Sequence, residues 1–158
     1  MQLDDAAHEP VIDALLSASR VLATIAAHSL NEMADPVTLT QYRTLDVLVS
    51  RGPQNLAGLA LSVGVTPATA TRMCDRLVKK HLIVRSEQEG DRRHIRLAAT
   101  AKGRHLVVTV TEHRRQEIEK IVDAIGTDEQ VALVRSLRRF TSAAEVIARS
   151  DGPPEGGL

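Results

Sequence analysis

The chain has 158 residues, of which 43% are hydrophobic and only Tyr42 and Phe140 are aromatic, so global disorder is excluded and a core of aliphatic side chains on packed helices is predicted. No apolar run approaches the roughly 20 residues that a membrane helix needs, and the acidic N-terminus lacks a signal-peptide pattern, so we expect a cytoplasmic protein with no membrane contact. The net charge is zero, with 20 basic and 20 acidic residues, and the single cysteine, Cys74, excludes an internal disulfide.

Two helices are predicted in the first third of the chain. Apolar residues recur at spacings of three and four over residues 11–32, which indicates a long helix that the Asp35-Pro36 pair ends. Thr40 is expected to cap a second helix, because apolar residues follow it at helical spacing until residues 51–53, Arg-Gly-Pro, stop it.

A helix-turn-helix pattern follows. Asn55 is expected to cap a short helix that runs to about Ser62, and Gly64 is expected to make the turn. Thr66 is then expected to cap a fourth helix with Pro67 at its first position, where the missing N–H of proline costs nothing. Two short capped helices joined by a glycine turn are typical of proteins that place a helix in a DNA groove.

The fourth helix is predicted to have two different faces. Small residues near its start would let the backbone approach DNA closely, and the basic side chains behind them can reach bases or phosphates. One alternative is an ordinary amphipathic helix with a solvated basic face. Another is a winged-helix module whose basic face binds an acidic protein partner and not DNA. Helical spacing places Ala70, Met73, Cys74 and Leu77 inward, and Ala68, Thr69, Arg72, Arg76 and Lys79 outward.

A β-hairpin is predicted directly after this helix. Residues 81–85 and 95–98 alternate apolar and polar side chains, and a polar loop that contains Gly90 lies between them. A hairpin in this position is the wing of a winged helix.

Two long helices are predicted to complete the fold. Residues 100–125 and 127–148 carry apolar side chains at helical spacing, and Thr127 and Gln130 are expected to form a capping box at the start of the second helix. The tail, residues 151–158, is expected to be disordered. The predicted fold class is therefore mainly α with a small β-hairpin wing, an α+β arrangement.

Charge is unevenly distributed along the chain. Residues 66–105 contain ten basic and four acidic side chains, a net charge of +6, so the remaining residues carry −6. A basic segment on an acidic body predicts one face that binds a polyanion such as double-stranded DNA.

The sequence contains no recognisable catalytic motif. The six histidines are scattered, and none has the close spacing to cysteine or aspartate that binds a metal. No glycine-rich loop is placed to hold phosphate, and no serine stands in a nucleophile motif. We therefore expect neither catalysis nor a cofactor.

Residues 11–148 resemble a transcriptional regulator of the MarR family. A lone helix-turn-helix pattern is weakly specific, but here it is joined to an Asp-x-Arg wing and flanked by long helices at both ends. The resemblance is most specific in residues 64–72, GVTPATATR, and in the wing, where Asp91-Arg92-Arg93 is followed by Ile95, Leu97, Thr100 and Gly103.

The chain departs from the family pattern at a few positions. The family more often has glycine where His81 stands at a helix end, and Gly58 inside the third helix should cost about 1 kcal/mol relative to alanine. Ala99 and Ala101 replace larger or more helix-directing residues between the wing and the following helix. None of these positions is an expected DNA contact.

The resemblance implies a single MarR-type domain over residues 1–150 that works as a homodimer. Residues 38–104 would form the winged-helix DNA-binding lobe, and residues 8–34 and 105–150 would form the helical dimerisation lobe. The long terminal helices also carry more apolar surface than a small reading domain can bury. A symmetric dimer is expected to read a pseudo-palindrome with half-sites about 10 base pairs apart.

The resemblance also assigns contact residues. The fourth helix would enter the major groove, and Arg93 would enter the adjacent minor groove, where Asp91 braces it. The residues expected to bind DNA are Thr66, Pro67, Ala68, Thr69, Thr71, Arg72, Arg76, Lys79, Arg92 and Arg93.

Members of the family commonly repress transcription and respond to small phenolic or aromatic molecules. A small effector that releases the DNA is therefore expected, although the sequence identifies no residue of its pocket. Some members respond to oxidation of a cysteine, which leaves Cys74 as an alternative redox switch. A structural role for Cys74 is favoured, because buried cysteines in apolar surroundings are usually inert.

Overall fold

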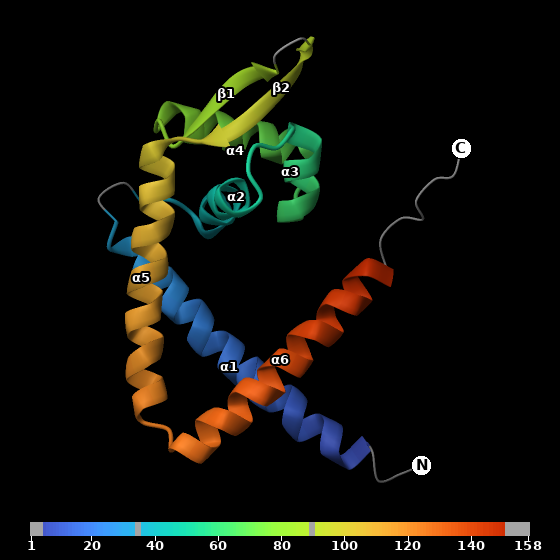
Figure 1. Ribbon diagram of the computed structural model, residues 1–158, viewed down its shortest axis with the longest axis vertical. Coiled ribbons are helices and arrows are strands. Elements are labelled where there is room, and N and C mark those ends of the chain that lie inside the picture. The colour runs from blue at the N-terminus through green and yellow to red at the C-terminus, as the bar shows by residue number, and fades with distance from the viewer. Residues whose placement is uncertain (1–4, 34–35, 89–90, 151–158) are drawn as a thin grey trace. The chain divides into compact units, whose positions relative to one another are not determined.

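The computed structural model describes residues 5–33, 36–88 and 91–150, and the side chains of residues 8–33, 36–86 and 95–147. Helices predominate within these ranges and one antiparallel hairpin is present, which confirms the predicted fold class (Figure 1). In chain order the elements are α1 (Asp5–Asn31), α2 (Leu39–Ser50), α3 (Leu56–Val63), α4 (Pro67–Lys79), β1 (Ile83–Gln88), β2 (Asp91–Ala99), α5 (Ala101–Asp123) and α6 (Thr127–Ser150).

The chain divides into two compact units within α5. The first unit, Met1–Glu117, contains α1 to α4, the hairpin and most of α5, and the second, Ile118–Leu158, contains the end of α5 and α6. Figure 1 shows α2, α3, α4 and the hairpin gathered at the N-terminal end of α5. The predicted disordered tail, residues 151–158, lies outside the described residues.

The core of the first unit is aliphatic, as predicted. Tyr42 is its aromatic side chain, and the Tyr42 hydroxyl lies 3.2 Å from Thr111 Oγ1 on α5, so its polar end stays hydrogen-bonded. The largest fully buried aliphatic side chains come from α2, α3, α4, α5, β2 and the turn before β1, and they are Leu45, Leu59, Leu77, Leu82, Leu97 and Val110.

The helix-turn-helix is capped as predicted. Asn55 Oδ1 accepts a hydrogen bond from Gly58 N at 2.7 Å, and Thr66 Oγ1 accepts one from Thr69 N at 3.2 Å. Gly64 ends α3 with a φ of 73°, a left-handed conformation that glycine adopts without steric cost. These local interactions fix where α3 ends and where α4 begins.

The N-cap of α2 is Thr38, so the prediction of Thr40 was wrong. Thr38 Oγ1 accepts from Gln41 N at 3.2 Å, and Gln41 Oε1 accepts from Thr38 N at 3.0 Å, which completes a capping box. Thr38 has a glutamine three residues later, whereas Thr40 has Arg43 at that spacing and cannot form the reciprocal pair.

The predicted capping box of Thr127 and Gln130 was also wrong. Gly126 stands before α6, and its N–H donates to Glu129 Oε2 at 3.1 Å. Gln130 Nε2 instead donates to Ile125 O at 2.9 Å, close to the end of α5. Gln130 Nε2 also donates to Val122 O at 3.1 Å in the last turn of α5, so this side chain connects the start of α6 to the end of α5.

The hairpin is longer than predicted, and Gln54 forms an additional antiparallel bridge with Leu97 of β2. β1 and β2 are antiparallel, with Arg85 opposite Leu97. Gln54 N donates to Leu97 O at 3.0 Å, and Leu97 N donates to Gln54 O at 2.8 Å. This bridge ties the segment between α2 and α3 to the base of the wing.

The turn between α4 and β1 is tight, and α5 approaches it closely. His81 has a φ of 58°, which costs a residue other than glycine about 1 kcal/mol. Thr100 Oγ1 donates to His81 O at 2.8 Å. A Cβ atom on Gly103 would lie 2.1 Å from Leu82 O, so only glycine fits at position 103.

α1 is more apolar than expected. By length and composition alone, His8–Asn31 is a helix that could cross a membrane, with a mean hydropathy of 1.4, which contradicts the expectation that no apolar stretch approaches this length. Helices that pack in a protein core have the same composition, and α1 buries Ile25 and Leu30 in the first unit. Its exposed large apolar side chains are Val11, Ile12, Leu16, Val21 and Leu22.

α6, in the second unit, also exposes apolar side chains. Single exposed apolar residues are ordinary, but a row of them along one helix indicates a surface that another protein surface covers. The exposed large apolar side chains of α6 are Val131, Leu133, Val134, Leu137, Phe140, Val146 and Ile147.

Candidate nucleic-acid interface

α4 has the two faces that the sequence predicted. Ala70, Met73, Cys74 and Leu77 are buried, and this row anchors the helix in the core. The helix start is held by hydrogen bonds that leave its outer surface open, because Thr66 Oγ1 donates to Thr69 Oγ1 at 3.0 Å and Thr71 Oγ1 donates to Pro67 O at 2.9 Å. The exposed residues are Thr66, Pro67, Ala68, Thr69, Thr71, Arg72, Arg76 and Lys79.

Two polar contacts hold α4 against its neighbours. Asp75 forms an ion pair with Arg85 of β1, with 46% and 43% of their side chains exposed, so this pair orients the helix more than it stabilises it. Lys80, at the C-cap of α4, donates through Nζ to Pro36 O before α2. α4 is therefore connected to β1 of the hairpin and to the segment before α2.

For the predicted wing contacts, the structure describes the backbone but not the side chains. Asp91, Arg92 and Arg93 belong to the backbone of β2, but the side chains of residues 87–94 are outside the described part of the chain. The minor-groove contact of Arg93 and its brace by Asp91 therefore stay predictions.

A polar cavity of about 290 Å³ lies between α2 and α4, and sequence reasoning missed it. The missed signal was the Thr-x-x-Gln pattern, which places a buried glutamine at the first turn of α2. Only the tertiary structure shows that this turn faces the basic side of α4. The residues that line this cavity, here called the α2–α4 cradle, are Thr38, Thr40, Gln41, Thr69, Arg72, Met73 and Arg76.

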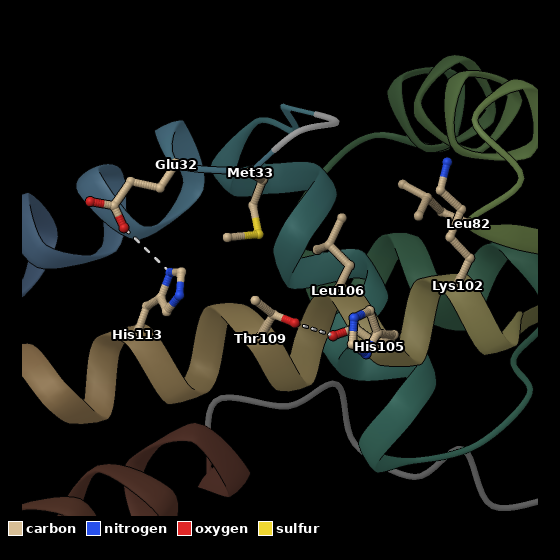
Figure 2. Close-up of a pocket in the computed structure, with 8 residues that line it drawn as sticks. All are labelled: Glu32, Met33, Leu82, Lys102, His105, Leu106, Thr109 and His113. Carbon is tan, nitrogen blue, oxygen red and sulfur yellow. Dashed lines mark hydrogen bonds and ion pairs between the residues drawn. The ribbon is translucent and has the colours of Figure 1, made fainter.

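A second cavity, of about 370 Å³, opens between the end of α1 and the first half of α5 (Figure 2). It combines an apolar wall with cationic and hydroxyl groups, which is the composition of a site for a small organic molecule. Its lining residues, here called the α1–α5 cleft, are Glu32, Met33, Leu82, Lys102, His105, Leu106, Thr109 and His113.

Two of the six scattered histidines, His105 and His113, line the α1–α5 cleft. His113 Nδ1 is buried and lies 3.3 Å from Glu32 Oε2, but no hydrogen bond forms between it and any described residue (Figure 2). His105 lies two helical turns earlier on α5, and its carbonyl accepts from Thr109 Oγ1 at 3.0 Å. The spacing of four residues places these three side chains on one face of α5, and only the tertiary structure shows the cavity beside that face.

Cys74 is fully buried, as expected for a structural cysteine. Burial raises the pKa of its thiol, and the smaller influences of Arg85, which lowers it, and Asp75, which raises it, leave it above its ordinary value. The thiolate is the form that oxidants attack, so this position disfavours a redox switch at neutral pH.

Comparisons with known proteins agree with this arrangement. The sequence profile of the MarR family matches residues 37–95. The HTH-type transcriptional repressor NicR of Pseudomonas putida is 30% identical over 115 residues, which cover 72% of this chain and 73% of NicR. The crystal structure of RV1404 from Mycobacterium tuberculosis is 46% identical, with a TM-score of 0.80 over 86% of this chain and 93% of that one. NadR, solved in complex with 4-hydroxyphenylacetate, is 25% identical, with a TM-score of 0.61 over 82% and 91% of the two chains.

The helix-turn-helix, the hairpin that follows it and the exposed basic face of α4 define a winged-helix DNA-binding regulator of transcription. The relatives that match over most of their length are regulators of this kind and not enzymes. The chain belongs to the MarR family.

Proposed function

We propose that this chain is a homodimeric repressor that binds a pseudo-palindromic operator and leaves it when a small aromatic anion binds. The observation that carries the proposal is the exposed face of α4, on which Arg72, Arg76 and Lys79 follow a short run of small residues. FabT of Streptococcus pneumoniae, which shares this fold, has been solved in complex with DNA.

The proposed DNA contacts are of three kinds: to base edges, to phosphates and to the minor groove. Arg72, one turn into α4, is proposed to reach a base edge, since arginine can bind guanine through two hydrogen bonds. Lys79, in the last turn, is proposed to bind a phosphate. Arg93 of the wing would enter the minor groove, braced by Asp91, and Arg92 would contact the DNA beside it. The major-groove contact would be lined by Thr66, Pro67, Ala68, Thr69, Thr71 and Arg76.

Two separate apolar surfaces support the homodimer. The first half of α1 and most of α6 each expose several large apolar side chains, and a cluster of exposed apolar side chains is typical of a protein–protein interface. The dimerisation lobe would combine residues 8–34 and 105–150, and residues 38–104 would read the DNA. Two-fold symmetry then places the half-sites about 10 base pairs apart.

The α1–α5 cleft is the proposed effector site. Lys102, His105 and His113 offer cationic or donor groups, and Met33 and Leu106 offer an apolar surface for a ring. Glu32 is the one carboxylate of the lining, and it lies against His113. NadR binds 4-hydroxyphenylacetate, an aromatic carboxylate of suitable size and charge.

Operator binding is tested with Arg72→Ala and Lys79→Ala on a duplex selected from a random library. Arg72→Ala is expected to lower affinity by about 1–3 kcal/mol and to relax the preference at one base position. Lys79→Ala is expected to weaken all duplexes evenly and to reduce the slope of log affinity against log salt by about 0.9. Fluorescence anisotropy over a series of salt concentrations measures both quantities.

Two results would overturn these assignments. An unchanged base preference for Arg72→Ala would remove the base contact, and equal salt slopes for Lys79→Ala and wild type would remove the phosphate contact. If the wild-type protein binds no duplex at low salt, the regulator function itself fails and a winged-helix module that contacts proteins becomes the better interpretation.

The effector site is tested with His113→Phe, which keeps a ring of similar size and removes the imidazole nitrogens. We expect affinity for 4-hydroxyphenylacetate to fall about 10- to 100-fold, since a hydrogen bond to a charged group is lost. Affinity for DNA without effector should stay within about twofold, because residue 113 is not on the DNA face. Calorimetric titration measures the first quantity, and 4-ethylphenol, which lacks the carboxylate, serves as the ligand control: it should bind both proteins equally.

A further inference from the structure

The α2–α4 cradle is rich in hydrogen-bond donors. Its floor is the first turn of α2, where the N–H groups of Leu39 and Thr40 have no hydrogen-bond acceptor among the described residues. Free N–H groups at a helix start carry a partial positive charge. The opposite wall is formed by α4, from which Arg72 and Arg76 line the cavity.

Gln41 is the buried polar side chain of this cavity. Only 7% of Gln41 is exposed, and its Oε1 is occupied by the hydrogen bond from Thr38 N at 3.0 Å. The two donors on its Nε2 therefore remain, and among the described residues they meet no acceptor. His113 Nδ1 is the fully buried side-chain atom without a partner among the described residues, so the Gln41 amide instead reaches the open space of the cavity, where an acceptor from outside the chain can meet it.

The charged side chains that line the cradle also favour an anionic ligand. No described carboxylate lines it, and the ion pairs among the described residues include neither the Arg72 nor the Arg76 guanidinium. The two arginines are four residues apart on one helix face, where like charges repel and destabilise the helix slightly. Thr69 adds a hydroxyl that accepts from Thr66 Oγ1 and keeps its own hydrogen to donate. Such a set of donors without acceptors suits an oxyanion.

We propose that the α2–α4 cradle binds one phosphate of the DNA backbone, held by Arg76, Gln41 and the first turn of α2. This inference rests on the proposed DNA-binding function and adds α2 to the contact surface. Arg72 stands at the edge of the cradle, from which it extends to its base. Because phosphate contacts set the register and depth of a helix in the groove, the cradle fixes the position of α4 on the operator.

Gln41→Glu is the decisive variant, because it separates folding from binding. A glutamate at the third helical position still accepts from Thr38 N, and its charge interacts favourably with the helix start, so thermal stability should be unchanged or slightly higher. The same carboxylate repels a phosphate. We expect affinity for the selected duplex to fall about 10- to 100-fold, and the salt slope to fall by about 0.9.

Gln116→Glu is the matched control. It makes the same change in net charge on the exposed surface of α5, away from the cradle, and should change affinity less than about twofold. In a second arm, single phosphates of the duplex are replaced in turn by uncharged methylphosphonate linkages. At one position in each half-site, wild type and Gln41→Glu should bind with similar affinity, because the repelled charge is gone.

A free phosphate ion is the other source of the same chemistry. Thermal melts without DNA, in inorganic phosphate and in chloride at equal ionic strength, detect it. Phosphate stabilisation of wild type together with full DNA affinity of Gln41→Glu would assign the cradle to a free ion and overturn the proposal. Equal affinities and salt slopes of Gln41→Glu and wild type would overturn it without affecting the proposed function, whereas a wild type that binds no duplex would overturn both.

Discussion

Gly103→Ala is expected to lower the free energy of unfolding by about 3 kcal/mol, the upper end of the cost of overpacking a core. The added Cβ would lie 2.1 Å from Leu82 O and 3.2 Å from Leu45 Cδ2. Backbone cannot yield as a flexible side chain can, so the first turn of α5 must move away from the turn before β1. Urea unfolding followed by circular dichroism measures the change, and the melting temperature should fall by about 6–12 °C.

The movement would also break local hydrogen bonds. Thr100 N donates to Leu82 O at 3.0 Å, and Gly103 N donates to Thr100 Oγ1 at 3.0 Å, so the three residues form one junction. Gly126→Ala is the control, since its Cβ would meet only Glu129 Oε2 at 3.4 Å, and it should cost less than about 1 kcal/mol. If Gly103→Ala is as stable as this control, α5 does not approach Leu82 as closely as described.

Leu137→Glu is expected to convert the protein to a monomer and to lower operator affinity about 100-fold or more. Leu137 lies in the exposed apolar row of α6, and in a symmetric dimer the substitution places two charges in the interface. A monomer binds one half-site and loses the gain in effective concentration that linking two reading lobes provides. Size-exclusion chromatography with light scattering measures the mass, and fluorescence anisotropy measures the affinity.

Ser142→Glu is the matched control for this prediction. Ser142 is exposed and follows Arg138 and Arg139 at helical spacing, on the side of α6 that faces away from Leu137, so the same charge should leave the dimer and its operator affinity unchanged. A Leu137→Glu variant that remains dimeric would show that α6 is not the dimer surface, and the apolar surface of α1 would then be tested in the same way.

The features that local chemistry determines were predicted well. Asn55 and Thr66 cap their helices because each is followed by a free backbone N–H two or three residues later, and nothing distant competes. The two faces of α4 follow from helical spacing alone. The error at Thr40 arose because the full reciprocal pattern, which Thr38 and Gln41 satisfy, was not compared. Thr127 and Gln130 do have that pattern, but the Gln130 side chain bonds to Ile125 O instead, so local spacing alone could not decide this cap.

The features that depend on distant packing were not predictable. The α2–α4 cradle joins Gln41 to Arg76 across the helix-turn-helix, and the α1–α5 cleft joins Glu32 to His113 across most of the first unit. Neither pair has a spacing that a single sequence could relate. The apolarity of α1 was underestimated because scattered polar residues interrupt it, although its average over a helix is high.

Leu82 connects the α1–α5 cleft to the C-terminal end of α4, so a displacement at the cleft can tilt this helix. Leu82 lines the α1–α5 cleft and follows α4 by one short turn, and Lys102 of the cleft donates to Lys80 O at the end of α4. A 13-residue helix is a stiff rod about 20 Å long, so a tilt of about 5° at this end moves the other end by nearly 2 Å. A molecule bound in the cleft could therefore move Thr69 and Arg72 away from the DNA contacts proposed for them while α4 stays folded. Binding linkage then requires operator DNA to weaken effector affinity by the same factor, which titrations with and without the duplex would detect.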